Sequence, residues 1–497
     1  MHGYLQLKFL WIGTIVVTLI AAGCRSQQQN RPNVLFIAVD DLNDWITLFD
    51  SDNPIRTPHI ERLAAKGVFF THAYCSSPAC NPSRASLLTG KRPHKTGIYG
   101  NKSDWRRALP DTETIQQYFM KHGYYSAGAG KIFHHHWDGA FHDTASFDDF
   151  QPMPDSYPDS PIPAEKLNGF EWYGSKNTDW GAWPLEETDA VDYRTASYAV
   201  DFLSKPHDSP FMLSVGIFRP HMPMYSPPAY RNQYPVEGAV MPAVKADDWA
   251  DLPTGAAKLM EPTTWFWDGM EQAMAEDPNA WPDMVTSYQA AATFADAQIG
   301  RVLDALERSA HADNTVIVLW SDHGYHLGEK RHMEKFALWE KTTRIPFILV
   351  APGKIKPGTT VHAPVDMTTV YPTLVDLCGL PEKQAVDGQS VVPLLEDPDM
   401  PFPPALMTYM KGNHAVRTER WRYIRYADGS EELYDHEEDP HEWHNLAGEH
   451  RHSNTIDSLR QFIPSSDAPD VADMTKPSGV KSTEYKADGD ATNTEGK

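Results

Sequence analysis

Runs of apolar residues that end in polar or acidic residues recur along the chain, and they predict a buried sheet. The first run covers residues 33–39 and leads directly into Asp40 and Asp41. A continuous apolar run suits a strand that is buried on both faces of a largely parallel sheet. The same reasoning predicts further strands at 68–70, 211–217, 315–320 and 347–350.

Between these runs, apolar residues recur with helical spacing. A short amphipathic helix is predicted at 60–66, where Gly67 would close it, and another at 114–122. Longer helical patterns cover 193–203 and 285–306. Strands that alternate with helices indicate an α/β domain with a mixed sheet and helices on both faces, which we assign to residues 30–398.

The pattern changes near residue 398. Short runs of alternating hydrophobicity predict antiparallel strands, and a helix is predicted at 454–463. Residues 399–465 would therefore form a smaller C-terminal α+β subdomain. The last segment, 466–497, consists largely of Ser, Asp, Pro, Lys, Thr and Gly with few large apolar residues, and we expect it to be disordered.

Two long segments, 152–184 and 247–282, are predicted to be surface excursions. The first is rich in Pro, Gly, Asp and Trp, and the second is acidic and contains Trp. In a compact enzyme, such loops commonly wall a binding cleft. The alternative is that they only decorate the surface, and both interpretations stay open here.

The N-terminus has the pattern of an export signal. Lys8 precedes a short apolar stretch, and the small residues Ala21-Ala22-Gly23 lead up to Cys24. Residues 1–23 are therefore predicted to be a signal peptide, because the apolar stretch is too short to span a bilayer. Ala-Gly-Cys resembles a bacterial lipoprotein box with Cys24 as the lipidated residue, although leucine is usual where Ala21 stands. The expected location is the periplasm or the cell surface; ordinary cleavage with release into the periplasm is the alternative to the lipid anchor.

The formal net charge of −23 at pH 7 argues against nucleic acid as the partner. It also argues against simple electrostatic steering of a polyanion. An anionic substrate would therefore need a local basic pocket. No contact with a membrane is expected except through the possible N-terminal lipid.

The most informative motif is the run Cys80 to Gly90, which reads Cys-Asn-Pro-Ser-Arg-Ala-Ser-Leu-Leu-Thr-Gly. Pro82 is predicted to be the first residue of a helix, so Cys80 would lie just ahead of a helix N-terminus, where backbone N–H groups attract an anion. Arg84 lies one turn further on and could brace an oxyanion. The alternative is that Cys80 is an inert buried thiol, which would leave Ser83, Arg84 and the terminal Thr-Gly unexplained.

This run resembles the signature of the type I sulfatases, C-x-P-S-R-x-x-x-L-T-G, at every fixed position. The resemblance implies that a formylglycine-generating maturation enzyme oxidises Cys80 to formylglycine, an aldehyde whose hydrate is the nucleophile. It also implies an alkaline-phosphatase-like fold, in which helices sandwich a mixed sheet.

Two pairs of possible metal-binding residues follow predicted strands. Asp40 and Asp41 end the first strand, and Asp322-His323 comes after the strand at 315–320. Active sites of open α/β sheets gather at the carboxyl ends of strands, so the two pairs are expected to converge. Three carboxylates and one nitrogen suit a hard divalent cation. The resemblance implies one Ca2+ ion, bound by Asp40, Asp41, Asp322, His323 and the residue made from Cys80.

The segment 123–134 resembles the second sulfatase signature. This resemblance implies that Lys131 clamps sulfate and that His134 assists the hydrated aldehyde. His135 and His136 adjoin it, so a histidine-rich metal site is the alternative.

Two more segments complete the expected anion pocket. Residues 218–223 resemble the family segment whose histidine, here His221, contacts sulfate near the leaving oxygen. Lys335 matches the family's last sulfate-binding lysine. The sequence departs from the family at Lys330, where histidine is usual, and at Met333, where tryptophan is usual.

Together these residues predict a sulfatase. The resemblance implies that the hydrated aldehyde attacks sulfur while the metal and four basic side chains neutralise the sulfuryl oxygens. The leaving alcohol would take a proton from His221 or Lys335, and His134 would accept one when sulfate is expelled. The expected catalytic residues are Cys80, Arg84, Lys131, His134, His221 and Lys335.

The Pro-His segment around His221 and the Lys-Ile-Phe-His ending at His134 most closely resemble iduronate-2-sulfatase and its bacterial relatives. The expected substrate is therefore a sulfated carbohydrate, of algal ulvan type or glycosaminoglycan type. A phosphodiesterase or phosphonate hydrolase of the same superfamily is one alternative. A surface glycan-binding lipoprotein that has lost catalysis is the other.

The remaining cysteines, Cys75 and Cys378, do not indicate a disulfide framework. Cys75 lies in an apolar and small context that is typical of a buried residue. A bridge between the two stays open.

Overall fold

The computed structural model describes residues 31–134, 141–152 and 163–474 of the chain. Its centre is an eight-stranded sheet with the order β13-β2-β12-β9-β1-β7-β4-β5. In chain order these strands are β1 Asn33–Asp40, β2 Val68–Phe70, β4 Tyr125–Gly130, β5 Asp149–Gln151, β7 Phe211–Pro220, β9 Thr315–Ser321, β12 Phe347–Val350 and β13 Thr359–Val361. The five apolar runs of the sequence all form strands of this sheet.

The strand directions make the sheet mixed. β1 runs parallel to both of its neighbours, β7 and β9, and β4 runs parallel to β7 and β5. β12 is antiparallel to β9 and to β2. The parallel centre explains why the run at 33–39 has no alternation of polar residues, since both of its faces are covered.

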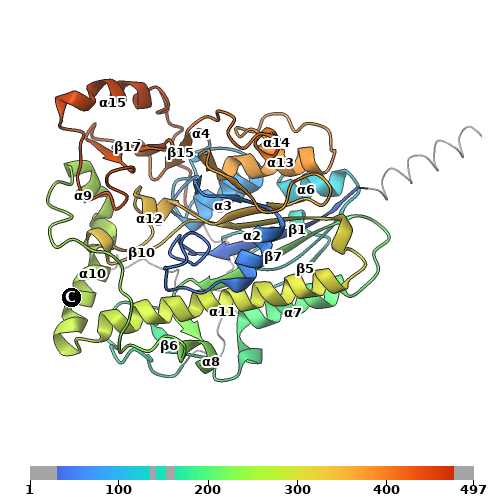
Figure 1. The fold of residues 1–497 in the computed structure, drawn as a ribbon, viewed down its shortest axis with the longest axis horizontal. Coiled ribbons are helices and arrows are strands. Elements are labelled where there is room, and N and C mark those ends of the chain that lie inside the picture. Colours follow the sequence, from blue (N-terminus) through green and yellow to red (C-terminus); the bar gives the residue numbers. More distant parts are fainter. Residues whose placement is uncertain (1–30, 135–140, 153–162, 475–497) are drawn as a thin grey trace, which may run out of the picture.

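Helices cover both faces of the sheet. Alternate residues of β1 enter two different cores: Leu35, Ile37 and Val39 enter one, and Val34 and Phe36 enter the other. In Figure 1 the first face is covered by α7 and α11, and the second by α3, α6 and α13. These helices are α3 Cys80–Thr89, α6 Ile115–Lys121, α7 Val191–Leu203, α11 Ala280–Arg308 and α13 Val370–Leu377. The expected α/β fold, with a mixed sheet sandwiched by helices, is confirmed.

Helix boundaries differ from the sequence pattern by a few residues. The helix expected at 60–66 is α2, Pro58–Lys66, and the one expected at 285–306 begins earlier, at Ala280. The helix expected at 114–122 starts after Thr114, which caps it in a capping box with Gln117.

Residues 247–282 were predicted to be a long surface loop, and this prediction is wrong. The segment contains α9 Thr254–Met260 and α10 Thr264–Glu276. α10 buries Phe266, Met270 and Ala273, which recur with helical spacing. The Trp residues and acidic neighbours concealed this pattern in the sequence.

The C-terminal subdomain is built on a four-stranded antiparallel sheet, which lies at the upper left of Figure 1. Its strands are β15 Ala405–Thr408, β16 His414–Arg417, β17 Trp421–Arg425 and β18 Glu431–Asp435, and its helix is α15 Ser453–Arg460. The expected small α+β unit is therefore present.

The prediction that the chain is disordered from residue 466 onward is wrong for residues 466–474. In this segment the backbone N–H groups of Ala468 and Val471 donate to the carbonyl oxygens of His94 and Gly97, at 2.7 and 3.0 Å. Backbone hydrogen bonds hold the segment, and the partly buried Val471 packs against one of the two cores. The rest of the expected tail, the signal peptide 1–23 with Cys24, and His135 and His136 lie outside the described residues. Among the helices that the structure describes, none is long and apolar enough to cross a membrane.

Candidate active site

The carboxyl ends of β1 and β9 meet at one edge of the sheet and carry the predicted acidic residues. β1 ends at Asp40, and Asp322 follows β9 directly. The Asp41 N–H donates to the Asp322 carboxylate at 3.1 Å, which joins the two strand ends. All three carboxylates are buried, with at most 1% of each residue exposed. The convergence expected from the sequence is therefore confirmed.

Asp41 has a backbone φ of 61°, in the left-handed region that is uncommon outside glycine. Tyr288 of α11 supports this turn, because its hydroxyl donates to the Asp41 carbonyl at 2.7 Å and accepts from the Asn43 N–H at 3.0 Å. The sequence did not predict this role for Tyr288. A single tyrosine inside a long amphipathic helix gives no local signal for a contact so far along the chain.

The helix behind the Cys80 motif begins at Cys80, with Ala79 as its N-cap, and not at Pro82 as expected. Pro82 is tolerated at the third helical position because the N–H groups of the first turn have no partner within the helix. Cys80 still lies at a helix N-terminus. Every residue of α3 is buried.

Arg84 lies one turn into α3 and is fully buried. Its Nε donates to Asp322 at 2.8 Å and its Nη2 donates to Asp40 at 3.1 Å. Its Nη1 donates to the carbonyl oxygens of Lys131 and Ile132. In this arrangement Arg84 fixes the orientation of two carboxylates and of the chain at Lys131, rather than pointing freely toward an anion.

Two lysines and a histidine surround the Cys80 sulfur. The Sγ atom lies 3.2 Å from His323 Nε2, 3.5 Å from Lys335 Nζ and 3.8 Å from Lys131 Nζ. Lys335 also donates to both carboxylate oxygens of Asp41, at 3.1 and 3.2 Å. The sequence-distant residues thus form one site around a single side chain.

Four of the five residues in the predicted metal-ligand set lie together as one group. One ligand atom each from Asp40, Cys80, Asp322 and His323 lies within 4.8 Å of all the others. Asp41, Cys80 and His221 form a second, overlapping group by the same measure. Hard carboxylate oxygens dominate the set, so the donor chemistry fits a divalent cation that prefers oxygen.

The carboxylates do not all respond to burial in the same way. Burial alone would raise the pKa of Asp40, but the charges of Lys131 and Arg84 hold it well below its usual value. Burial raises the pKa of Asp322 to about 6, although Arg84 opposes this shift. Burial also raises the pKa of Asp41 well above its usual value, against the charge of Lys335.

Burial shifts the remaining groups toward states that suit the site. It lowers the pKa of His323 and of His221 well below the usual value, so both imidazoles are neutral at pH 7. Burial raises the pKa of the Cys80 thiol, although Lys131 and Lys335 oppose the shift. An unmodified Cys80 would therefore be a protonated, weak nucleophile.

His221 and His134 are both buried, each with 4% of its surface exposed. His221 Nε2 lies 4.0 Å from an Asp41 carboxylate oxygen, and its Nδ1 lies 2.6 Å from the Met222 carbonyl oxygen. His134 lies in the segment that follows β4, three residues after Lys131. Its approach to residue 80 stays a prediction.

The three cysteines that the structure describes, Cys75, Cys80 and Cys378, are all free and buried. The open possibility of a Cys75–Cys378 bridge is therefore not realised. Burial raises the pKa of the Cys75 and Cys378 thiols, which agrees with unreactive side chains.

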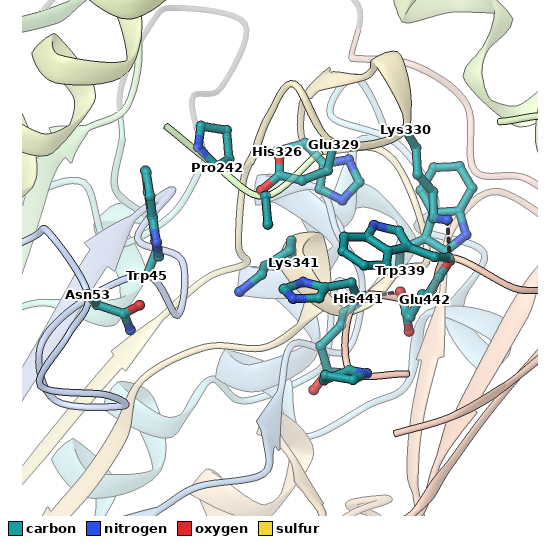
Figure 2. A pocket seen from close by; sticks show the side chains of 14 residues that line it. Trp45, Asn53, Pro242, His326, Glu329, Lys330, Trp339, Lys341, His441 and Glu442 are labelled. Atoms are coloured by element: carbon teal, nitrogen blue, oxygen red, sulfur yellow. Dashed lines mark hydrogen bonds between the residues drawn. The ribbon is translucent and has the colours of Figure 1, made fainter. Parts of the chain in front are cut away.

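A separate cavity of about 130 Å³ lies where the segment after β9 meets the C-terminal subdomain (Figure 2). Lys330, Trp339 and Glu442 line it together with Trp45 and Lys341. None of the predicted catalytic or metal-binding residues lines this cavity. Lys330, where the family usually has histidine, is buried here and pairs with Asp248 at 2.8 Å.

Comparisons with known proteins agree with this geometry. Residues 32–380 match the family model described as sulfatase, and residues 328–467 match the one described as the C-terminal part of N-sulphoglucosamine sulphohydrolase. A sulfatase from Formosa agariphila is 38% identical over 93% of this chain and 92% of its own length. Iduronate 2-sulfatase from Mus musculus is 27% identical over 92% of this chain and 98% of its own length.

Solved structures share the fold. One is a protein in complex with its substrate, D-glucosamine-2-N,6-O-disulfate, with a TM-score of 0.68 at 23% identity over 87% of this chain and 96% of that chain. Another is a phosphonate monoester hydrolase from Silicibacter pomeroyi, with a TM-score of 0.70 at 23% identity over 87% of this chain and 94% of that chain. At this identity both show the fold alone, and the sequence matches decide between the two chemistries. The chain belongs to the sulfatase family of sulfuric ester hydrolases.

Proposed function

We propose that this sulfatase hydrolyses sulfate esters of a sulfated carbohydrate, in a polysaccharide or oligosaccharide that carries uronate or other anionic groups. The observation that carries the proposal is the convergence of Lys131, Lys335 and the acidic group on Cys80, at a helix N-terminus. Such a site accepts a compact anion in an otherwise acidic protein. The saccharide part rests on relatives and fold neighbours whose names or bound substrates are sulfated sugars.

The metal is proposed to be one Ca2+ ion held by Asp40, Asp41, Asp322 and His323. Three carboxylates and a neutral imidazole supply the oxygen-rich donor set that this ion prefers. When bound, the ion supplies positive charge next to residue 80 and to the sulfate oxygens. Burial raises the pKa of Asp41 and Asp322, and a cation there would favour their charged forms.

Residue 80 is proposed to act as formylglycine, so the Sγ atom marks where the oxygens of the mature side chain lie. Lys131 and Lys335 are within 3.8 Å of this atom and would neutralise the sulfuryl oxygens. Arg84 would hold Asp40 and Asp322 in place. His221 or Lys335 would give the leaving alcohol its proton, and His134 would accept a proton from residue 80.

The protein is proposed to be exported to the periplasm or the cell surface and to be anchored by a lipid at Cys24. The support is the sequence pattern of residues 1–24. A formylglycine-generating enzyme would be its maturation partner. Mass analysis of the protein released from membranes by detergent would test the lipid, and an unlipidated mature N-terminus would contradict it.

The substrate is tested with matured protein on a panel of algal and animal sulfated polysaccharides, before and after lyase digestion. Free sulfate is measured by ion chromatography, and the Cys80→Ala variant is the matched control. We expect sulfate release from at least one saccharide and none from the variant. Activity confined to small aryl or choline esters would contradict a carbohydrate substrate.

The same preparation separates the alternatives from the sequence. Aryl sulfate, aryl phosphate and aryl phosphonate are compared side by side. Preference for the phosphorus esters would indicate a phosphonate hydrolase or phosphodiesterase. Saccharide binding without any turnover would indicate a glycan-binding protein that has lost catalysis.

A further inference from the structure

Lys335 reaches Asp41 and Cys80 from a segment with an irregular backbone. The residues on either side of it, Glu334 and Phe336, have φ values of 72° and 76°. A non-glycine residue in this region costs about 1–3 kcal/mol and persists only where the surrounding structure imposes it. Contacts beyond these three residues must therefore hold Lys335 in place. The Phe336 N–H donates to the Pro78 carbonyl oxygen at 3.0 Å, and Glu334 pairs with His326.

A further set of contacts comes from the C-terminal subdomain. Arg422 of β17 is fully buried, and its Nη1 donates to the Leu338 carbonyl oxygen at 2.7 Å. Its Nη2 pairs with the Glu340 carboxylate, and Arg417 of β16 donates to the same carboxylate at 3.1 Å. Two arginines of the C-terminal sheet thus bind the chain a few residues after Lys335.

Two further bonds cross the same boundary. Trp339 Nε1 donates to the Glu432 carboxylate of β18 at 2.7 Å, and the Glu340 N–H donates to the Glu442 carboxylate at 2.9 Å. Trp339 and Glu442 line the cavity in Figure 2, where the two parts of the chain lie against each other. Backbone and side chain of three consecutive residues, 338–340, are therefore held from the C-terminal side.

The charges at this contact are paired closely enough to keep it in one arrangement. Burial alone would raise the pKa of Glu340, but Arg417, His436 and Arg422 hold it well below its usual value. Removing one partner of a buried ion pair typically costs about 3–5 kcal/mol, whereas an apolar replacement of the whole pair is often neutral. Buried pairs of this kind therefore define geometry more than they add stability.

We propose that Arg422 and Glu340 are positioning residues for Lys335, and that the C-terminal subdomain sets the catalytic lysine against Asp41 and Cys80 through them. The subdomain would thus contribute to catalysis without supplying a group that touches sulfate. The proposal rests on the role of Lys335 in the proposed function.

A double-mutant cycle tests whether Arg422 and Glu340 act through Lys335. Glu340→Gln and Arg422→Lys are made in the natural background and in the Lys335→Ala background. Each should lower kcat/KM for the best saccharide substrate by about 10–100-fold in the first background, because a misplacement near 1 Å costs this much. In the second background the further loss should stay below about 2-fold, because the residue they position is gone. An equal fold-loss in both backgrounds would overturn the proposal.

Trp339→Phe keeps the cycle decisive if the charge variants do not fold, since it removes one neutral donor and leaves the ion pairs intact. Arg420→Ala is the matched control, because Arg420 pairs with Asp435 on the same sheet and its side chain is 44% exposed. We expect the control to change kcat/KM less than about 2-fold, as for most exposed pairs. A loss at Arg420 as large as that at Arg422 would show a general effect of the sheet and overturn the assignment.

Crystal structures give a readout that does not depend on turnover. In the Trp339→Phe and Glu340→Gln variants, Lys335 Nζ should move away from Asp41, beyond the 3.1–3.2 Å found here. If the natural protein cleaves no sulfate ester, the proposed function fails, but this distance still decides the positioning. An unchanged distance in both variants would contradict it.

Discussion

Two buried clusters of charged side chains lie close together in this molecule, and they differ in how fully their carboxylates are paired. The Cys80 cluster consists of Asp40, Asp41, Asp322, Arg84, Lys131 and Lys335 around Cys80. The Glu340 cluster consists of Glu340, Glu442, Arg417, Arg422 and His436. Carboxylate and imidazole ligand atoms lie within 4.8 Å of one another at both places, with His323 beside the first cluster and His436 within the second, so ligand grouping alone does not tell the clusters apart.

The pKa directions separate the two clusters. In the Glu340 cluster, arginines outweigh burial and hold the pKa of Glu340 and of Glu442 below the usual value. In the Cys80 cluster, burial outweighs the lysines and arginine and raises the pKa of Asp41 and Asp322, while Asp40 alone is lowered. Buried carboxylates whose charges are fully paired with arginines are typical of a cluster that stabilises the fold. A set of carboxylates with raised pKa values beside a reactive side chain is typical of a functional site.

The largest expected effect separates chemistry from stability at Cys80. Cys80→Ala should abolish turnover, by about 10⁴-fold or more, because it removes the group that attacks sulfur. Its thermal midpoint should stay within a few degrees, since only a small buried atom is lost. Glu340→Ala, in contrast, should lower the free energy of unfolding by about 3–5 kcal/mol, because it leaves buried arginines unpaired. Turnover and thermal unfolding of the two variants are compared.

Peptide mass spectrometry across residues 72–91 accompanies this comparison. Protein made without the maturation enzyme should fold normally, retain an unmodified Cys80 and be nearly inactive. Full multiple-turnover activity from wholly unmodified protein would contradict the mechanism.

A smaller effect concerns the metal. Removing Ca2+ with a chelator should lower the thermal midpoint and abolish turnover, and adding Ca2+ at 100 times its dissociation constant should restore about 2.7 kcal/mol of stability. In Asp322→Ala, which lacks one of the three carboxylates, this calcium-dependent gain should largely disappear. In Glu340→Gln it should remain, because the Glu340 cluster already has its cations. If the calcium-dependent gain in stability were lost in Glu340→Gln and kept in Asp322→Ala, the ion would bind in the Glu340 cluster. This result would contradict the proposed site.

The Cys80 cluster could be predicted from the sequence because its chemistry is written in local motifs. The pairs at Asp40 and Asp322 end apolar strand runs, and the Cys80 motif and Lys131 lie in recognisable segments. Parallel strands bring such ends together, so the topology needed only the fold class. Tyr288 and the exact start of α3 were not predictable, since they depend on packing between distant elements.

The Glu340 cluster could not be predicted in the same way. Arg417 and Arg422 are ordinary residues of short antiparallel strands, and their partner Glu340 lies far away in the sequence. A buried ion pair has no sequence signature, because most charged residues with the same local pattern are exposed. The segment 466–474 was missed for a similar reason: backbone hydrogen bonds to distant residues and the packing of a single side chain, Val471, hold it.

The smallest expected effect is a difference in pH dependence between the two clusters, measured in calcium-free protein. Asp322 has a folded pKa of about 6, above the unfolded value of 3.8, so the folded state binds an extra proton between these values. Its contribution to stability is therefore present below about pH 4 and lost as the pH rises through 6. Glu340 has a folded pKa well below 4.5, so its contribution is present above that value and lost as the pH falls.

Asp322→Asn and Glu340→Gln remove these contributions one at a time. Between pH 4 and pH 7, the unfolding free energy of Asp322→Asn should rise relative to the natural protein by about 1–3 kcal/mol. That of Glu340→Gln should fall by less than about 1 kcal/mol in this range, because most of the Glu340 contribution is lost below pH 4.5. Urea unfolding at several pH values measures both differences against the same reference. Slopes of the same sign in the two variants would show that burial is offset equally in both clusters, and would remove the distinction between them.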